Sequence, residues 1–169
     1  MHEVAAEELE RACFGGGLPE QAELHLRLAG LTYHEDRVAE SHLQKALAIA
    51  PDHAAVLIGL YRYYFYKGRL SEALDVAELC LLKSAGDNGL DADWHKVKQG
   101  DANFGSYDAI LPRFYLFSLK AYGYLHMRLG NRDDGRAAVE KLLELDPGNK
   151  LGGKVLLEVL DREGREDDE

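Results

Sequence analysis

The stretch GDNGLDADWHKVKQGDANFG, residues 86 to 105, holds four aspartates and the chain's only Trp, and it invites a chemical interpretation. Carboxylates gathered in one loop are typical Ca²⁺ ligands, and an EF-hand loop needs oxygen donors at positions 1, 3 and 5 and a Glu at position 12. A loop starting at Asp87 has Gly at position 3, and loops starting at Asp91 or Asp101 have Ala or Pro at position 12. The spacing therefore favours aspartates that cap turns, and we predict no metal site.

Histidines and cysteines are the next candidates for chemistry. No HxxxH or Cys/His spacing typical of zinc ligands occurs among the histidines considered, which are His25, His34, His42, His53, His95 and His126. Cys13 and Cys80 form no CxxC pair and no disulfide framework. The motifs GxxxxGK[ST], GxSxG and GxGxxG are not found in a suitable context. We therefore expect no catalytic residue and no cofactor, so the protein is not expected to be an enzyme.

The charge of the chain excludes some classes of partner. Thirty acidic against 20 basic residues give a net charge of -10, without a run of Lys or Arg. Such a chain repels phosphate, so neither nucleic acid nor a membrane surface is an expected partner. The first residues, MHEVAAEELERA, carry acids where a signal peptide carries positive charge, and no window approaches 18 apolar residues. Together with the unpaired cysteines, this pattern predicts a cytoplasmic protein.

A pattern of about 34 residues repeats along the chain, which is typical of stacked helical units. The segment HEDRVAESHLQKALAIAPDH (34–53) recurs in pattern as KGRLSEALDVAELCLLKSAG (67–86) and as LGNRDDGRAAVEKLLELDPGN (129–149). Each copy has a polar or Gly-containing turn, apolar residues at helical spacing and then a helix stop. Another helical pattern precedes each copy, as in AAVLIGLYRYYFYK (54–67). The predicted unit is a helical hairpin, present three times.

These hairpins resemble the tetratricopeptide repeat (TPR) family, whose 34-residue unit carries small residues near positions 20 and 27 and Pro at 32. The first unit has Ala39, Ala46 and Pro51 at these positions, and the third unit has Gly123 at position 8 and Pro147 at 32. The resemblance implies an all-α fold, a right-handed TPR-type superhelix of three helical hairpins with an N-terminal helix, an inserted short helix and a C-terminal capping helix.

Position 8 departs from the family in the first two units. The family prefers a small residue there, but these units have Arg27 and Tyr61. The departure indicates either splayed hairpins or a register that is shifted by one residue. An unrelated array of helical hairpins is the alternative to a TPR fold.

The resemblance divides the chain into segments of a single TPR domain, 1–169. They are an N-terminal helix with a glycine hinge (1–19), repeat 1 (20–53), repeat 2 (54–87), an insertion (88–115), repeat 3 (116–149), a capping helix (150–163) and an acidic, disordered tail (164–169).

The insertion and the first turns of two helices lead to further expectations. In the insertion, Leu90, Trp94 and Val97 share one helical face, so we expect a short helix with Trp94 at least half buried against the second or third repeat. Pro112 should lie in the first turn of a long helix. The pair Gly152-Gly153 should weaken the first turn of the capping helix.

In TPR proteins the first helix of each hairpin lines the concave groove. The matching positions form an apolar and aromatic surface with basic residues among them, and this surface is the predicted peptide-binding groove: Leu24, Leu28, Ile58, Arg62, Phe65, Tyr66, Phe117, Lys120, Tyr124, Met127 and Arg128. It suits an amphipathic helix or an extended peptide with bulky side chains and an acidic group. The sequence leaves open whether the groove is free or filled by the insertion or the N-terminal helix.

The expected function is a non-catalytic protein–protein interaction module. It would act as an adaptor, scaffold or assembly chaperone that binds a peptide or helix of a partner protein. The alternative is a structural protein that self-associates, for instance as a homodimer, with its groove occupied by its own segments.

Overall fold

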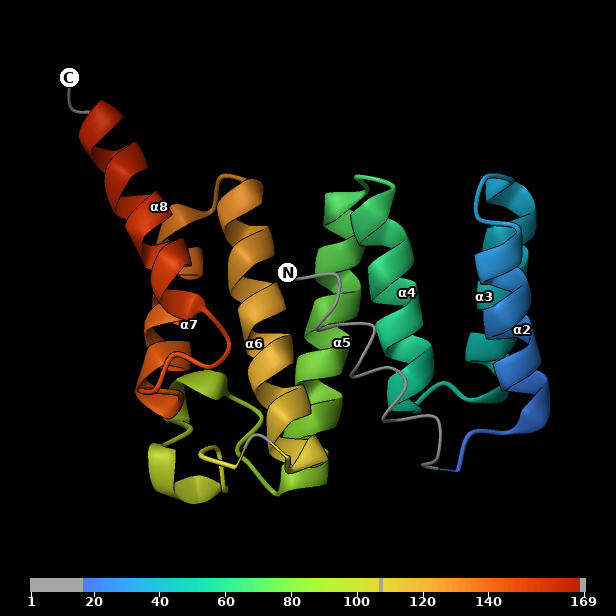
Figure 1. The fold of residues 1–169 in the computed structure, drawn as a ribbon, viewed down its shortest axis with the longest axis horizontal. Helices are drawn as coiled ribbons and strands as arrows, with labels where there is room; N and C mark the ends of the chain where they lie inside the picture. Colours follow the sequence, from blue (N-terminus) through green and yellow to red (C-terminus); the bar gives the residue numbers. More distant parts are fainter. Residues whose placement is uncertain (1–16, 107, 168–169) are drawn as a thin grey trace. The chain divides into compact units, whose positions relative to one another are not determined.

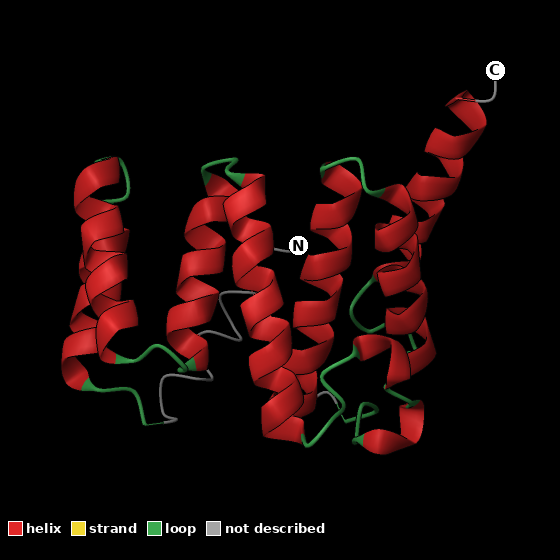
Figure 2. Ribbon diagram, turned by 180° about the vertical axis from the view of Figure 1, so that it is seen from behind, coloured by secondary structure: helices red, strands yellow, loops and turns green. Residues whose placement is uncertain are grey.

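The structure, a computed structural model, describes residues 17–106 and 108–167, which are helical and contain no strand (Figure 1, Figure 2). The all-α prediction is confirmed. The predicted N-terminal helix lies almost entirely outside the described residues. The α-helices are α2 (Glu20–Leu31), α3 (Asp36–Ile49), α4 (Ala54–Tyr66), α5 (Leu70–Asn88), α6 (Ile110–Arg128), α7 (Arg132–Leu145) and α8 (Gly153–Asp167), and the 3₁₀ helices are η1 (Trp94–Lys96) and η2 (Gln99–Asp101).

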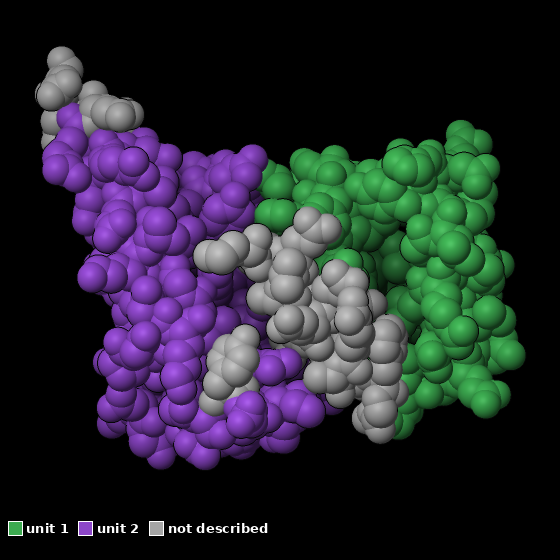
Figure 3. All heavy atoms as spheres, in the orientation of Figure 1, with its two compact units in different colours: residues 1–76 green, residues 77–169 purple. Residues whose placement is uncertain are grey.

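The chain divides into two compact units, residues 1–76 and 77–169, which Figure 3 shows in different colours. The boundary falls within α5, between Val76 and Ala77. The assignment of the whole chain to one TPR domain stays a prediction.

In the first unit, α2 and α3 form a closely packed hairpin. α2 buries Ala22, Leu26 and Ala29, and α3 buries a matching stripe of Ala39, Leu43 and Ala46. Small alanine side chains let two helices approach closely, because little volume separates the backbones. The side chain of Arg27 is two-thirds exposed. This arginine therefore does not obstruct the contact between the two helices.

The turns that end α4 and α6 have the same structure. Gly68 has φ 72°, its N–H donates to the Phe65 carbonyl at 3.1 Å, and the N–H of Arg69 donates to the Tyr64 carbonyl at 2.9 Å. Gly130 has φ 87°, and the corresponding bonds from Gly130 and Asn131 measure 3.1 and 2.8 Å. Both are Schellman motifs, in which a residue with positive φ satisfies the last carbonyls of a helix. The same turn thus closes the first helix of the second and third hairpins.

In the second unit, α6 and α7 approach each other closely at two glycines. A Cβ on Gly123 would lie 3.2 Å from the Ala138 Cβ and the Val139 Cγ2. A Cβ on Gly135 would lie 2.8 Å from the Met127 Cγ and 3.1 Å from the Gly123 carbonyl oxygen.

α6 begins at Ile110, six residues before the predicted start of repeat 3, and Pro112 lies in its first turn as expected.

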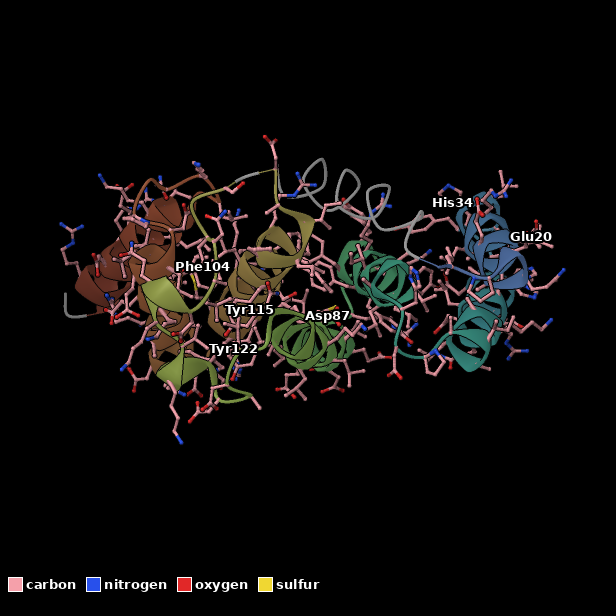
Figure 4. All side chains as sticks on the ribbon, turned by 90° about the horizontal axis from the view of Figure 1, so that it is seen from below. Glu20, His34, Asp87, Phe104, Tyr115 and Tyr122 are labelled. Carbon is pink, nitrogen blue, oxygen red and sulfur yellow. The ribbon has the colours of Figure 1, made fainter. Side chains whose placement is uncertain are left out.

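The insertion contributes to the core of the second unit. Figure 4 labels Phe104 from the insertion and Tyr115 and Tyr122 from α6. Trp94 is only 8% exposed, and its ring meets the Tyr122 ring edge-on at 5.9 Å between centroids. The expected burial of Trp94 against the third repeat is confirmed. The core cluster consists of Leu81, Ala85, Trp94, Val97, Phe104, Tyr115, Leu116, Leu119, Ala138, Leu142 and Leu145.

The short helix expected in the insertion is shorter than its residue pattern indicated and is of the 3₁₀ type. The insertion forms η1 and η2, each three residues long. The Asp91 carboxylate accepts from the backbone N–H of Asp93, and the Asp93 carboxylate accepts from that of His95. Aspartate side chains that bind nearby N–H groups compete with the helical hydrogen-bond pattern, which explains the short turns. These aspartates therefore have the turn-capping role that the sequence indicated.

The C-terminal helix corrects one expectation and shows how the two glycines before it are placed. α8 continues to Asp167, so residues 164–167 are helical and not a disordered tail. Gly152 lies before the helix with φ 76°, and a Cβ on Gly153 would lie 2.8 Å from the Leu142 Cδ2. Gly152 therefore has a backbone conformation that favours glycine, and Gly153 packs closely against the end of the Leu142 side chain.

Candidate functional site

A hollow of about 130 Å³ lies in the first unit, between α2, α3 and α4. We call it the tyrosine hollow. Among the described residues, a Cβ on Gly30 would meet no atom within 4 Å, so these residues do not close the cavity at this point. A cavity of about 150 Å³ accommodates benzene, whereas cofactor sites measure about 300 to 1,000 Å³. The hollow therefore has room for one bulky side chain. Its lining residues are Leu26, Ala29, Gly30, Tyr33, Leu43, Gly59, Arg62, Tyr63 and Tyr66.

Arg62 lines the tyrosine hollow and places a positive charge in its wall. Lys67 lies near its rim, with its Nζ 4.0 Å from the Tyr33 ring centroid, but the same Nζ forms an ion pair of 2.8 Å with Asp36. The hydrogen bond from Lys67 lowers the pKa of the Asp36 carboxyl. Burial, together with the charges of Glu40 and Asp36, raises the pKa of Tyr63 to about 12. Tyr63 is therefore a neutral hydroxyl at neutral pH.

A second ionic group holds the hairpins of the first unit together. The Arg69 guanidinium hydrogen-bonds to the carboxylates of Glu72 and Glu40, and it lies 4.8 Å from the Tyr64 ring centroid. Arg69 lowers the pKa of Glu72, and burial raises the pKa of Tyr64. Since its charge is matched by two carboxylates, Arg69 has a structural role.

The leucines of α2 form an exposed apolar stripe. Leu24 is 41% exposed, Leu28 is half-buried and Leu31 is 83% exposed. Their spacing of four and three residues places them on one side of the helix. Leu24 and Leu28 are therefore accessible, neither lines the tyrosine hollow, and their place in a groove stays a prediction.

The other predicted residues of the first unit differ in their exposure. Arg62 and Tyr66 line the tyrosine hollow. Phe65 is half-buried, with its ring 5.8 Å from Tyr61 and 5.7 Å from Tyr66. Ile58 has no exposed surface because it belongs to a run of consecutive buried residues in α4. In this conformation Ile58 offers no surface to a partner, and its role as a contact residue stays a prediction.

In the second unit the structure also separates buried from accessible candidates. Phe117 is 3% exposed and lies in a run of buried residues of α6, and its role as a contact residue stays a prediction. Met127 and Tyr124 are half-buried, and Arg128 is exposed. The Arg128 guanidinium donates to the Tyr124 hydroxyl at 2.8 Å. These three residues form an accessible basic and aromatic edge on α6.

Lys120 lies on α6 one turn before Tyr124. It is half-buried, and a Cβ on Gly152 would be 3.8 Å from its Nζ. Burial lowers the pKa of Lys120. Its ammonium forms no hydrogen bond or ion pair within the described part of the chain. It is therefore a partly desolvated cation whose charge the described residues do not neutralise.

A hollow of about 400 Å³ lies between the insertion and the end of α7. Its charged groups are already engaged within the protein. The Asp146 carboxylate accepts from the backbone N–H groups of Lys150 and Leu151, and the Lys150 ammonium donates to the Gly105 carbonyl at 2.7 Å. This hollow is a consequence of how the insertion is anchored, and we assign it no ligand.

The structure brings together two histidines that no zinc-ligand spacing connects in the sequence. His25 of α2 and His42 of α3 are 17 residues apart, and their Nδ1 atoms lie 3.0 Å from each other. No sequence motif marks this pair, because only the packing of the hairpin sets its distance. Among the described residues, no group of three His, Cys, Asp or Glu side chains could hold a metal ion.

These features define an all-α protein of packed hairpins with apolar and basic surfaces. No protein-family model and no solved structure matches the chain. The chain is 40% identical over 128 residues to a protein of Azotobacter chroococcum mcd 1 named "Uncharacterized 19.8 kDa protein in nifW 5'region". The aligned residues make up 75% of this chain and 72% of that protein. The chain belongs to the same family as that protein. In the described residues, no helix combines the length and apolar character needed to cross a membrane.

Proposed function

We propose that the chain is a TPR-type repeat protein that binds a segment of a partner protein in the cytoplasm and catalyses no reaction. The hairpins α2–α3 and α6–α7, and the Schellman turns after α4 and α6, support a repeated unit. The turn glycines Gly68 and Gly130 are 62 residues apart, which corresponds to one 34-residue period plus an insertion of 28. The role would be that of an adaptor or an assembly chaperone.

The tyrosine hollow is the observation that carries this proposal. An aromatic or branched aliphatic side chain of the partner would fill it, and an acidic group beside that side chain would meet Arg62. Burial of apolar area contributes about 25 cal/mol per Å² before the cost of ordering the partner. The leucine stripe of α2 would extend this contact along the first unit.

The composition of α4 and α6 supports an acidic partner. Neither helix contains an Asp or Glu, although the chain has 30 acidic residues. In the second unit, Lys120, Tyr124, Met127 and Arg128 would form a separate contact surface. Positive groups at an interface speed association with an acidic partner and fix its orientation.

Affinity measurements with a defined partner test this function. The Azotobacter relative is named for its place in the 5′ region of nifW, so the nifW product is the first candidate partner to be tested. Affinity capture from the native host identifies others. For each partner, we expect Arg62→Ala and Tyr66→Ala to weaken binding at least tenfold.

The matched control is Arg27→Ala, since Arg27 is exposed on α2 and does not line the hollow. It should bind like the unchanged protein, and all variants should keep their helical circular dichroism. Equal affinity in the hollow variants and the control would rule out this site. Self-association is the alternative, and a particle of twice the chain mass in light scattering would favour it.

A further inference from the structure

The histidine pair in the first unit has a geometry that goes beyond the proposed function. The Nδ1 atoms of His25 and His42 are 3.0 Å apart, and their ring centroids are 5.2 Å apart with 28° between the ring planes. We propose that these two imidazoles bind one divalent transition-metal ion, of the class Ni²⁺, Cu²⁺ or Zn²⁺, between α2 and α3.

The distance between the nitrogens is the first argument. Metal–imidazole bonds measure about 2.0 to 2.1 Å. Two nitrogens 3.0 Å apart can therefore both bond to one ion at an N–metal–N angle of about 90 to 100°. This angle is that of neighbouring ligands around a square-planar or octahedral ion. For this, the two rings must turn so that their Nδ1 lone pairs converge on a point to one side of the line that joins the nitrogens.

The rigidity of the hairpin is the second argument. The two rings come from adjacent helices whose buried alanine and leucine stripes face each other. The backbones are therefore already positioned, and binding requires only side-chain rotation. A preorganised site loses less conformational entropy when the ion binds.

The partners of the rings are the third argument. Each imidazole has the other as its hydrogen-bond partner within the described residues, and no carboxylate pairs with either. In the free protein, one ring must carry its proton on Nδ1 and the other must accept that hydrogen bond. When the ion binds, this proton moves to Nε2 of the same ring, so both ligands are neutral and no net proton is released.

The chemistry of the ligands selects the class of metal. Imidazole nitrogen favours Ni²⁺, Cu²⁺ and Zn²⁺ over Mg²⁺ and Ca²⁺, which prefer oxygen. Water would complete the coordination. The net charge of -10 raises the local concentration of cations. The ion would connect α2 to α3 and stabilise the hairpin, because it binds the folded state more tightly than the unfolded chain.

Titration of the full, untagged chain with NiCl₂ tests the site, by isothermal titration calorimetry and by thermal unfolding. We expect saturable binding and an increase in melting temperature. His25→Gln and His42→Gln should each reduce the Ni²⁺ affinity at least tenfold and remove the increase. The control is His34→Gln, an exposed histidine of the same unit that contacts Tyr33 through its ring. It should retain both effects.

Equal Ni²⁺ affinity in all three variants would overturn the proposal, and so would binding that survives in the His25→Gln/His42→Gln double variant. A second measurement does not depend on the folding of any variant. Substoichiometric Cu²⁺ should broaden the ring proton NMR signals of His25 and His42 in the unchanged protein before those of other histidines. Uniform broadening of all histidine signals would likewise overturn the site.

Discussion

The burial of Lys120 lowers the stability of the folded protein at neutral pH. Its ammonium is half-buried, and burial lowers its pKa. The folded protein therefore holds this proton more weakly than the unfolded chain does. The unfolded state binds more protons over the pH range between the lowered pKa and the usual value of 10.5, so the free energy of unfolding rises with pH in that range.

We expect Lys120→Met to raise the melting temperature at pH 7 by about 1 to 3 °C, because it removes the cost of burying a charge. Lys154→Met is the control, since Lys154 is exposed on α8 and should change stability little. Thermal unfolding followed by circular dichroism measures both. A lower melting temperature for Lys120→Met would show that the ammonium is stabilised by an interaction outside the described residues.

At the scale of elements, the contact between α6 and α7 depends on glycine. Gly135→Ala would place a Cβ 2.8 Å from the Met127 Cγ and 3.1 Å from a backbone oxygen, which cannot move aside easily. We expect a loss of about 1 to 3 kcal/mol in the free energy of unfolding. Gly164→Ala in α8 is the matched control, because its Cβ would meet nothing within 4 Å. It should stabilise the helix by about 0.5 to 1 kcal/mol in urea unfolding.

The ion pair between Asp36 at the start of α3 and Lys67 after α4 leads to a pH-dependent prediction. Because the hydrogen bond from Lys67 lowers the pKa of Asp36, the pair stabilises the protein above the unfolded-state pKa of about 3.8. This stabilisation is lost as the pH falls through the lower pKa of the folded state. Asp36→Asn should therefore lower the melting temperature slightly at pH 7 and hardly at all at pH 2 to 3. Differential scanning calorimetry at both values measures this, and an equal deficit at both would contradict it.

At the scale of the whole molecule, the insertion is part of the second unit's core. Trp94 is the only Trp, so its fluorescence reports on the insertion alone. We expect blue-shifted emission in the folded protein and a red shift on unfolding, since the ring is 8% exposed. Trp94→Ala should lower the free energy of unfolding by about 3 to 5 kcal/mol. Emission typical of a fully hydrated indole in the folded protein would contradict the burial of the insertion.

The local periodicity of the chain was sufficient to predict the helices. Alternating turns and apolar stripes predicted the hairpins, with differences mainly at their ends, such as the earlier start of α6 at Ile110. The insertion and the C-terminal tail were less predictable. Aspartate side chains replaced the expected helix by 3₁₀ turns, and α8 extended through residues that composition assigned to a tail.

The candidate site was predictable only in part. Repeat positions identified Arg62 and Tyr66, which line the tyrosine hollow, and they also selected Ile58 and Phe117, which are buried. The repeat register predicts which side of a helix a residue lies on. It does not predict how exposed that residue is, because the exposure depends on the neighbouring elements that cover it.

The sequence by itself determined the all-α class, the pairing of helices into hairpins and the inward position of Trp94. These properties depend on residue spacing along one helix or turn, and such spacing is present in the sequence. Only the tertiary structure decided which predicted groove residues remain accessible, that α6 and α7 approach closely at Gly135, and that His25 and His42 meet. Those properties depend on distances between helices, which are set by the packing of side chains far apart in the chain.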